Sequence, residues 1–253
     1  MNDVNRMNTS TRAVDQTYID EGLRAHMLRI YNYMTAALLL TGLVAFFFGK
    51  ASVVTNDLGQ IVALTEMGNA LFNSPLRWIV MLAPLGLVIY FASRINNMTA
   101  SRAQSVFWIF AGLMGLSLSY IFIAYTGTAI FQAFFITAGA FTGLSIWGYT
   151  TKKDLSAMGT FLIMGLIGII IASVVNMVIG SAQLHFIVSV LGVIIFAGLT
   201  AWDTQKLKRD WINRVQHSGE VVAEKSAIMG ALTLYLDFIN LFLFMLQFMG
   251  RRG

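Results

Sequence analysis

The sequence of 253 residues contains no cysteine, only two prolines and few charged side chains, which make up 11% of the chain. Without cysteine, the protein cannot form disulfides, thiolate metal sites or a cysteine nucleophile. Hydrophobic residues account for 57% of the sequence, and the mean hydropathy is +0.70. Such a composition is too apolar for a soluble globular domain and predicts a protein that crosses a membrane several times.

Further absences narrow the functional classes. The first 28 residues lack a short apolar core followed by a small-residue cleavage site, so we expect no cleaved signal peptide. The chain has no nucleotide-binding loop, which argues against an ATP-driven pump. Its net charge of +5 would suggest nucleic acid in a soluble protein, but basic residues of membrane proteins gather in cytoplasmic loops. We therefore expect the lipid bilayer as a partner, and no nucleic acid.

Seven apolar stretches are long enough, at about 20 residues, to cross the hydrocarbon core as helices. The predicted spans are residues 30–49, 77–93, 104–125, 130–149, 157–179, 184–202 and 226–248. Residues 1–29 are expected to form a cytoplasmic tail, mobile over 1–17, and a juxtamembrane helix. The seven-helix domain covers 30–250, and 251–253 form a C-terminal tail. The connection over 50–76 has room for a short surface helix.

The lysines and arginines test this topology. With a cytoplasmic N-terminus, thirteen of the 17 basic residues lie in cytoplasmic segments and four lie outside. Arg251 and Arg252, at the C-terminus, are two of the four exceptions. The excess follows the positive-inside rule and predicts a cytoplasmic N-terminus and an external C-terminus.

The seventh predicted span carries a single charged residue, Asp237, at its centre. An acid there costs about 2.5 to 3.5 kcal/mol on insertion, whereas each Leu, Ile, Phe or Val contributes about −0.3 to −0.6 kcal/mol. Twelve such residues are present, so the helix still inserts, but the carboxyl group needs a partner, a proton or a water-filled cavity. Helical spacing places Asp237 on a stripe that must face away from lipid, which predicts a central seventh helix. The stripe consists of Gly230, Thr233, Asp237, Asn240 and Phe244.

A second acid, Asp203, lies at the end of the sixth predicted span. It either caps that helix beside Lys206 or meets Asp237 from the neighbouring helix. Two carboxyl groups within a few ångströms share one proton and titrate in two macroscopic steps. Losing that proton leaves two like charges, which a hard cation such as calcium can bridge. Because Asp237 is roughly 18 Å along its helix from Lys225, contact requires the seventh helix to begin outside the membrane or the sixth to sit deep.

Other ionisable residues have simpler interpretations. Asp154 opens the fifth predicted span, where the helix dipole stabilises an acid. Arg94 ends the second span and either follows the positive-inside pattern or neutralises Asp203. Because His185 and His217 have no further histidine or acid at ligand spacing, we expect no zinc site.

Small residues recur at four-residue spacing in four predicted spans, a pattern that lets helix backbones approach closely in lipid. They are Ala111, Gly115 and Ser119; Gly139 and Gly143; Gly168 and Ala172; and Ala197 and Ala201. The pattern predicts a compact bundle and says nothing about function.

The chain resembles the transmembrane Bax inhibitor motif family, in particular its YccA-like bacterial inner-membrane branch. Four motifs carry the resemblance, in order FWIFAGLMGLSLSYIF, SIWGYTTKKDLSAMGTFLIMGLIG, FAGLTAWDTQKLK and GALTLYLDFINLFLFML, within about residues 84–250. It implies an all-α membrane protein with seven transmembrane helices, six surrounding a central seventh. It also implies a paired-aspartate pH sensor at Asp203 and Asp237, an arginine latch at Arg94, and a pH-dependent calcium leak. One departure is the tryptophan before Asp203, where a tyrosine is common.

The first predicted function is a pH-sensitive, calcium-permeable leak channel gated by Asp203 and Asp237, with calcium and protons as its ions and no cofactor. The alternative is a regulatory membrane protein that binds and modulates a membrane protease or a stress or cell-death pathway. An enzyme is disfavoured: intramembrane aspartyl proteases have one acid in a GxGD motif, whereas Asp237 lies in the sequence LYLD. A retinal protein is disfavoured because the seventh span has no lysine. The bacterial-like motifs and the lack of cysteine favour a bacterial inner membrane.

Overall fold

The computed structural model describes residues 2–58 and 60–250, with side chains from Asp20 onward. The helices are α1 (Asn2–Ala51), α2 (Glu66–Phe72), α3 (Leu76–Arg94), α4 (Ala100–Leu118), α5 (Ile121–Ala124), α6 (Gly127–Thr150), α7 (Ser156–Ile179), α8 (Ala182–Asn213) and α9 (Glu220–Met249), and two 3₁₀ turns are η1 (Ile95–Asn97) and η2 (Val215–His217). Seven helical segments in this part of the chain are long and apolar enough to cross a membrane. The predicted all-α membrane fold is confirmed.

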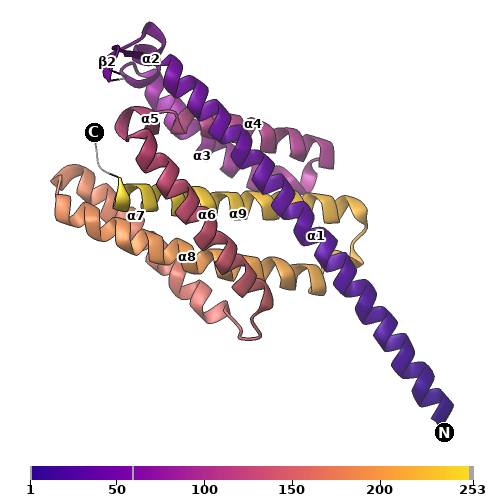
Figure 1. Cartoon of the computed structure of the whole chain (residues 1–253). Coiled ribbons are helices and arrows are strands. Elements are labelled where there is room, and N and C mark those ends of the chain that lie inside the picture. The colour runs from indigo at the N-terminus through magenta and orange to yellow at the C-terminus, as the bar shows by residue number, and fades with distance from the viewer. Residues whose placement is uncertain (1, 59, 251–253) are drawn as a thin grey trace.

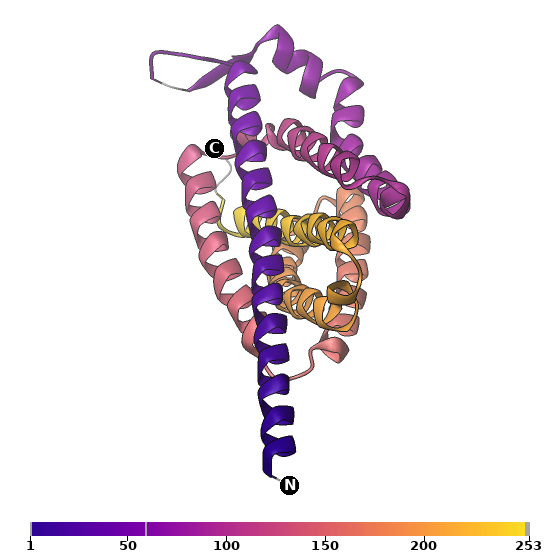
Figure 2. The same cartoon turned by 90° about the vertical axis from the view of Figure 1, so that its right-hand side faces the viewer.

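Helix α9 lies in the middle of the bundle (Figures 1 and 2). In its most apolar window 61% of residues are buried, against 17% for α3 and 11% for α7. Its Tyr235 is fully buried and shares a hydrogen bond of 2.7 Å with Thr41 on α1, whose hydroxyl also donates to the Ala111 carbonyl on α4. The central seventh helix expected from the polar stripe is therefore present.

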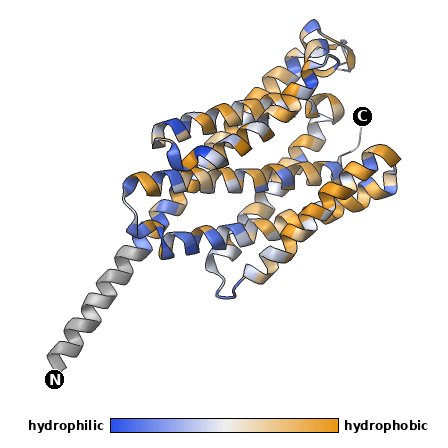
Figure 3. Cartoon of the chain, turned by 180° about the vertical axis from the view of Figure 1, so that it is seen from behind, coloured by the Kyte–Doolittle hydropathy of each residue, from blue (hydrophilic) through white to orange (hydrophobic). Residues whose placement is uncertain are grey.

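The bundle has two unlike ends (Figure 3). We call one the basic end: it holds η1, the 151–155 loop between α6 and α7, and the 214–219 turn between α8 and α9. The opposite, hairpin end holds strands β1 (Val53–Thr55) and β2 (Ile61–Leu64), which pair antiparallel with Val53 opposite Leu64. Helices α1, α4, α7 and α9 all end toward the hairpin end, as seven alternating spans require.

Three boundaries differ from the sequence predictions. Helix α1 begins at Asn2, so the expected tail over 1–17 is helical from that residue on. No glycine or proline interrupts residues 2–19, and nothing there stops the helix from extending. The 50–76 connection contains the short helix α2, as anticipated, but also the β-hairpin, which was not predicted.

The third predicted span is broken near its end. Helix α4 stops at Leu118 and α5 starts at Ile121, where 104–125 had been expected to be continuous. The hydroxyl of buried Ser119 donates to the Leu116 carbonyl at 2.6 Å. Such a local side-chain bond competes with the helical ladder and bends or ends a helix.

Candidate functional site

Two buried acids meet at the interface of α8 and α9. Asp203 on α8 and Asp237 on α9 are 7% and 5% exposed, and their carboxyl groups lie within hydrogen-bonding reach of each other. Two ionised carboxylates have no proton to share, so a hydrogen bond between them requires one proton on the pair. The second oxygen of Asp237, Oδ2, is buried and has no hydrogen-bond partner among the described residues. The structure thus brings together the two acids that the sequence singled out.

Long helices on both sides make this contact possible. The sixth span was predicted to end at Trp202, but α8 continues to Asn213, about 15 Å beyond Asp203. Helix α9 begins at Glu220, about 25 Å before Asp237. Both acids therefore lie well inside their helices. Asp203 is not the helix cap that the alternative interpretation made it.

Glycines on two neighbouring helices let α8 approach closely at this level. A Cβ atom at Gly148 on α6 would overlap the Ala201 carbonyl oxygen, and one at Gly159 on α7 would overlap the Trp202 ring. Both contacts immediately precede Asp203 in α8. Because a side chain at either glycine would push α8 away, these two notches fix where Asp203 lies.

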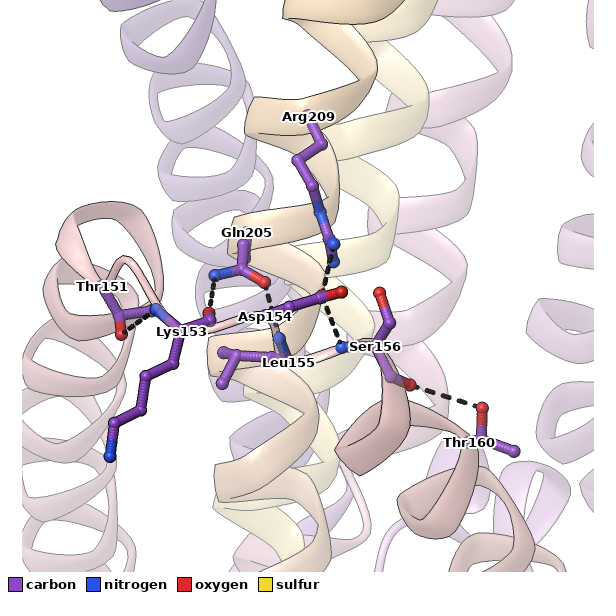
Figure 4. A network of polar contacts seen from close by, with 8 residues as sticks. All are labelled: Thr151, Lys153, Asp154, Leu155, Ser156, Thr160, Gln205 and Arg209. Atoms are coloured by element: carbon purple, nitrogen blue, oxygen red, sulfur yellow. Dashed lines mark hydrogen bonds and ion pairs between the residues drawn. The ribbon is translucent and has the colours of Figure 1, made fainter.

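The loop between α6 and α7 is tied to α8 one turn farther toward the basic end (Figure 4). Gln205 accepts a hydrogen bond from the Leu155 amide at 2.9 Å and donates to the Lys153 carbonyl at 2.7 Å. Arg209 forms an ion pair with Asp154. We call these contacts the loop clamp. They hold the segment that connects α6 and α7 against the part of α8 that carries Asp203.

Asp154 lies in the 151–155 loop, two residues before α7 begins at Ser156, and not in the first turn of the helix as the sequence predicted. Its Oδ1 accepts a hydrogen bond of 3.0 Å from the Ser156 amide. The hydrogen bonds from Ser156 and the neighbouring Arg209 guanidinium hold the pKa of Asp154 below its ordinary value. The side chain is exposed, so this acid stays ionised near neutral pH and does not resemble the buried pair.

An open cavity of about 720 Å³ gives access to the acid pair from the side of α7. Its polar or charged lining residues are Ser173 on α7, Asp203 and Lys206 on α8, and Thr233, Asp237 and Asn240 on α9. The exposed ammonium group of Lys206 lies 4.9 Å from the centre of the Trp202 ring. Lys206 is therefore the basic residue that lines the cavity together with the two acids. From the sequence, Lys206 was expected only to lie beside Asp203 at a helix end.

Arg94, the predicted latch, is not paired with Asp203 in this structure. Its side chain is exposed, and neither of the ion pairs found among the described residues involves it. The Lys225 ammonium donates to the carbonyl groups of Ile95, Asn96 and Met98, so the end of α3 lies level with Lys225. That position is about 18 Å along α9 from Asp237. The latch stays a prediction.

The site offers fewer oxygen ligands than a permanent calcium site usually has. Calcium takes six to eight oxygen ligands, usually including several carboxylates. The cavity offers two carboxyl groups, two hydroxyls and the Asn240 amide, whose nitrogen is held by the Leu236 carbonyl at 2.8 Å. Within the described residues no group of three or more His, Cys, Asp or Glu side chains is arranged to hold a metal ion.

Comparison with known proteins gives a consistent family assignment. The family described as "Inhibitor of apoptosis-promoting Bax1" matches residues 23–253. An uncharacterised protein of Rickettsia prowazekii is 44% identical over 243 residues, 96% of each chain. Inner membrane protein YbhL of Escherichia coli K12 is 42% identical over 231 residues, 91% of this chain and 93% of YbhL. An uncharacterised protein of Caulobacter vibrioides is 38% identical over 252 residues, 99% of this chain and 98% of its own.

Proposed function

The chain belongs to the Bax inhibitor family of membrane proteins, and from that premise we propose that it is a pH-sensitive, calcium-permeable leak channel. The Asp203–Asp237 pair is its gate and its pH sensor. By analogy with the inner membrane protein YbhL, the chain resides in a bacterial inner membrane. Its basic end faces the cytoplasm, following the positive-inside rule.

The observation that carries this proposal is the close approach of two buried carboxyl groups at the wall of a cavity. With one proton between them, the pair joins α8 to α9. Without it, two like charges face each other in a poorly solvated site, and they repel or take up a cation. A change in protonation is thereby converted into a change in helix contact and in affinity for calcium.

Lys206 sets the electrostatic balance at the mouth of the site. Among the described lining residues, the charged groups are the two acids and this lysine; α7 contributes only Ser173 as a polar group. An ammonium near two carboxylates favours their ionised form. It also repels an approaching divalent cation. Lys206 therefore tunes both the pH at which the pair responds and the flux through it.

The energy for the leak comes from the membrane potential. A divalent cation entering a negative interior gains about 4.6 kcal/mol per 100 mV. No nucleotide hydrolysis is needed, in keeping with a chain that lacks a nucleotide-binding loop. The protein has only to regulate a downhill pathway.

The test is calcium flux into proteoliposomes across a pH series. The wild-type chain is expected to leak calcium at a rate that changes with pH, and Asp203→Asn and Asp237→Asn are each expected to abolish the pH step. Asp57→Asn is the matched control, because it removes an exposed acid of the hairpin loop that has no contact with the cavity. If both variants at the pair keep the wild-type rate and pH response, the gate assignment is wrong.

A second candidate is a regulatory membrane protein that modulates a membrane protease or a stress or cell-death pathway. The observation that favours it is the family description, which names inhibition of another protein. Co-purification of partners from native membranes tests it, with loss of the partner on substituting the exposed basic residues Lys206 and Arg214 as the expected result. Binding without calcium flux would favour this candidate over the channel.

A further inference from the structure

The interface between α8 and α9 is organised in three layers, of which the acid pair is one. Seven residues from Asp203, Phe196 stacks on Phe244, which is seven residues from Asp237; the ring centres are 5.7 Å apart and the planes 25° apart. Seven residues farther along α8, Ser189 donates to Gln247 at 3.4 Å. At about 1.5 Å per residue, the aromatic layer lies about 10 Å from the acids, toward the hairpin end.

On α8 and α9 the aromatic layer is the part of the lining that lies farthest toward the hairpin end, whereas on α7 the lining of the cavity that holds the acids continues to Met177. Phe196 and Phe244 both line this cavity, together with Asn240, which lies between Asp237 and Phe244 on α9. Gly192 on α8 makes room for the stack, because a Cβ atom there would overlap the Phe244 ring. Because Gly192, one turn from Phe196, has no side chain, the Phe244 ring can pack against α8 at this position.

The two rings are a barrier to ions. Polar or charged side chains line the cavity from Lys206 and Thr233 as far as Asn240. Beyond that point along α8 and α9 the stacked rings offer no oxygen ligand, and the next polar side chains on these two helices are Ser189 and Gln247. Apolar constrictions of this kind stop ions by excluding the water that hydrates them.

We propose that the Phe196–Phe244 stack is a second, hydrophobic gate in series with the acid pair, and that it closes the pathway on the hairpin side. The gate opens when the Phe244 ring leaves Phe196. The inference rests on the proposed function, because it takes the route between α8 and α9 as the ion pathway.

Calcium flux through Phe244→Ala tests the gate directly. An aromatic stack is worth up to about tenfold in an equilibrium, so we expect the flux to rise by about tenfold while its pH dependence is kept. Phe248→Ala is the matched control: Phe248 pairs with Phe186 across the same two helices, with ring centres 5.8 Å apart, but it is 48% exposed and outside the cavity. The control should leave the flux unchanged; an equal rise in both variants overturns the gate.

Two further variants guard against a folding artefact. Gly192→Ala keeps both rings and displaces Phe244, so it should raise the flux in the same direction. Phe244→Leu keeps an apolar side chain in place and should hold the flux within about threefold of wild type, because dewetting depends on the apolar surface. If Phe244→Leu leaks as much as Phe244→Ala, or Gly192→Ala leaves the flux unchanged, the stack is not the gate.

A labelling experiment separates failure of the gate from failure of the channel. The chain has no cysteine, so Asn240→Cys and Gln247→Cys each introduce a single thiol on either side of the stack. A membrane-impermeant thiol reagent added on the hairpin side should modify the thiol at 247 but not the one at 240, and adding Phe244→Ala should expose the latter. If the thiol at 240 reacts equally with and without Phe244, the barrier does not exist. If Phe244→Ala makes the thiol at 240 reactive but no variant passes calcium, the barrier is supported and the proposed calcium channel is wrong.

Discussion

Charged residues in the centre of this bundle, at the interface of α8 and α9, have different surroundings from those at its rim, at the ends of the outer helices. Asp203 and Asp237 lie on the two helices that pack most extensively, and their carboxyl groups meet. Arg94 lies at the end of α3, a helix that packs chiefly on α4, and its side chain is exposed. An interior acid is forced to find a partner because leaving it alone in lipid is costly. A cation at the rim reaches water and needs none.

A buried ionisable residue therefore predicts which side chains meet, whereas an exposed one does not. The acid pair is located by packing: notches at Gly148 and Gly159 set the position of α8, and the loop clamp holds its basic end. The rim is attached to the centre at fewer points. One of these is Lys225, which bonds the three carbonyl groups around η1.

The largest effect is expected where the centre is packed most tightly. Gly148→Ala places a methyl group on the Ala201 carbonyl, whereas Gly143→Ala on the same helix places one in open space. Overpacking a close interface costs about 1 to 3 kcal/mol, so the first variant should unfold more easily. The second should be neutral or stabilised by up to about 1 kcal/mol, since alanine favours helix. Thermal unfolding in detergent, followed by circular dichroism, measures both, and equal stabilities would contradict the notch.

A smaller effect is expected where the rim is attached to the centre. Lys225→Ala removes three hydrogen bonds to carbonyl groups near the end of α3. Bonds to charged groups contribute about 1.5 to 3 kcal/mol when buried, but this side chain is only partly buried, so we expect about 1 kcal/mol. Hydrogen exchange should speed up around η1 and stay unchanged around Asp237. Lys152→Ala, which removes an exposed basic residue at the same end, is the control; equal exchange in both variants would show that Lys225 does not hold the rim.

The central helix could be predicted from the sequence, because burial in a membrane leaves a clear pattern of residues. One acid among twelve strongly apolar residues located α9 and its interior stripe, and the packing face at Gly115 is confirmed by its close approach to Thr41 and Val44 on α1. The same small-residue spacing was misleading at Gly139, Gly143 and Gly168, which have no atoms near the position of a Cβ. Small residues permit close packing only where a partner helix is present, and spacing alone does not reveal the partner.

Other features depended on tertiary contacts that no local pattern announces. Gln205 and Lys225 act through backbone atoms of distant segments, 50 or more residues away. The aromatic layer could have been found, because Phe196 and Phe244 each stand seven residues from an acid on adjacent helices. This spacing of seven residues can be interpreted only when the antiparallel pairing of α8 with α9 is known.

The next prediction concerns pH at the loop clamp, which lies outside the buried centre. The folded-state pKa of Asp154 is lowered, so its contribution to stability is present above the unfolded pKa of about 3.9 and is lost as the pH falls through the folded value. Between pH 6 and 8 Asp154 stays ionised, and Asp154→Asn should shift stability by a constant amount. Unfolding midpoints of both proteins across pH 3 to 8 measure this. Curves that diverge between pH 6 and 8 would contradict it.

The smallest effect on stability is expected at Arg94, and it tests the comparison most directly. Because Arg94 has no ion pair among the described residues, Arg94→Ala should change the free energy of unfolding by no more than about 0.5 kcal/mol. If the arginine latches Asp203 during gating, as the family resemblance implies, the same variant shifts the pH at which calcium flux is half-maximal. Arg102→Ala, an exposed arginine at the start of α4, is the control and should alter neither quantity. An unchanged pH profile in Arg94→Ala would confine pH sensing to Asp203, Asp237 and the neighbouring Lys206. Arg94 would then have no part in the gate: packing does not hold it near the acids in this structure, and it would not reach them when the channel opens.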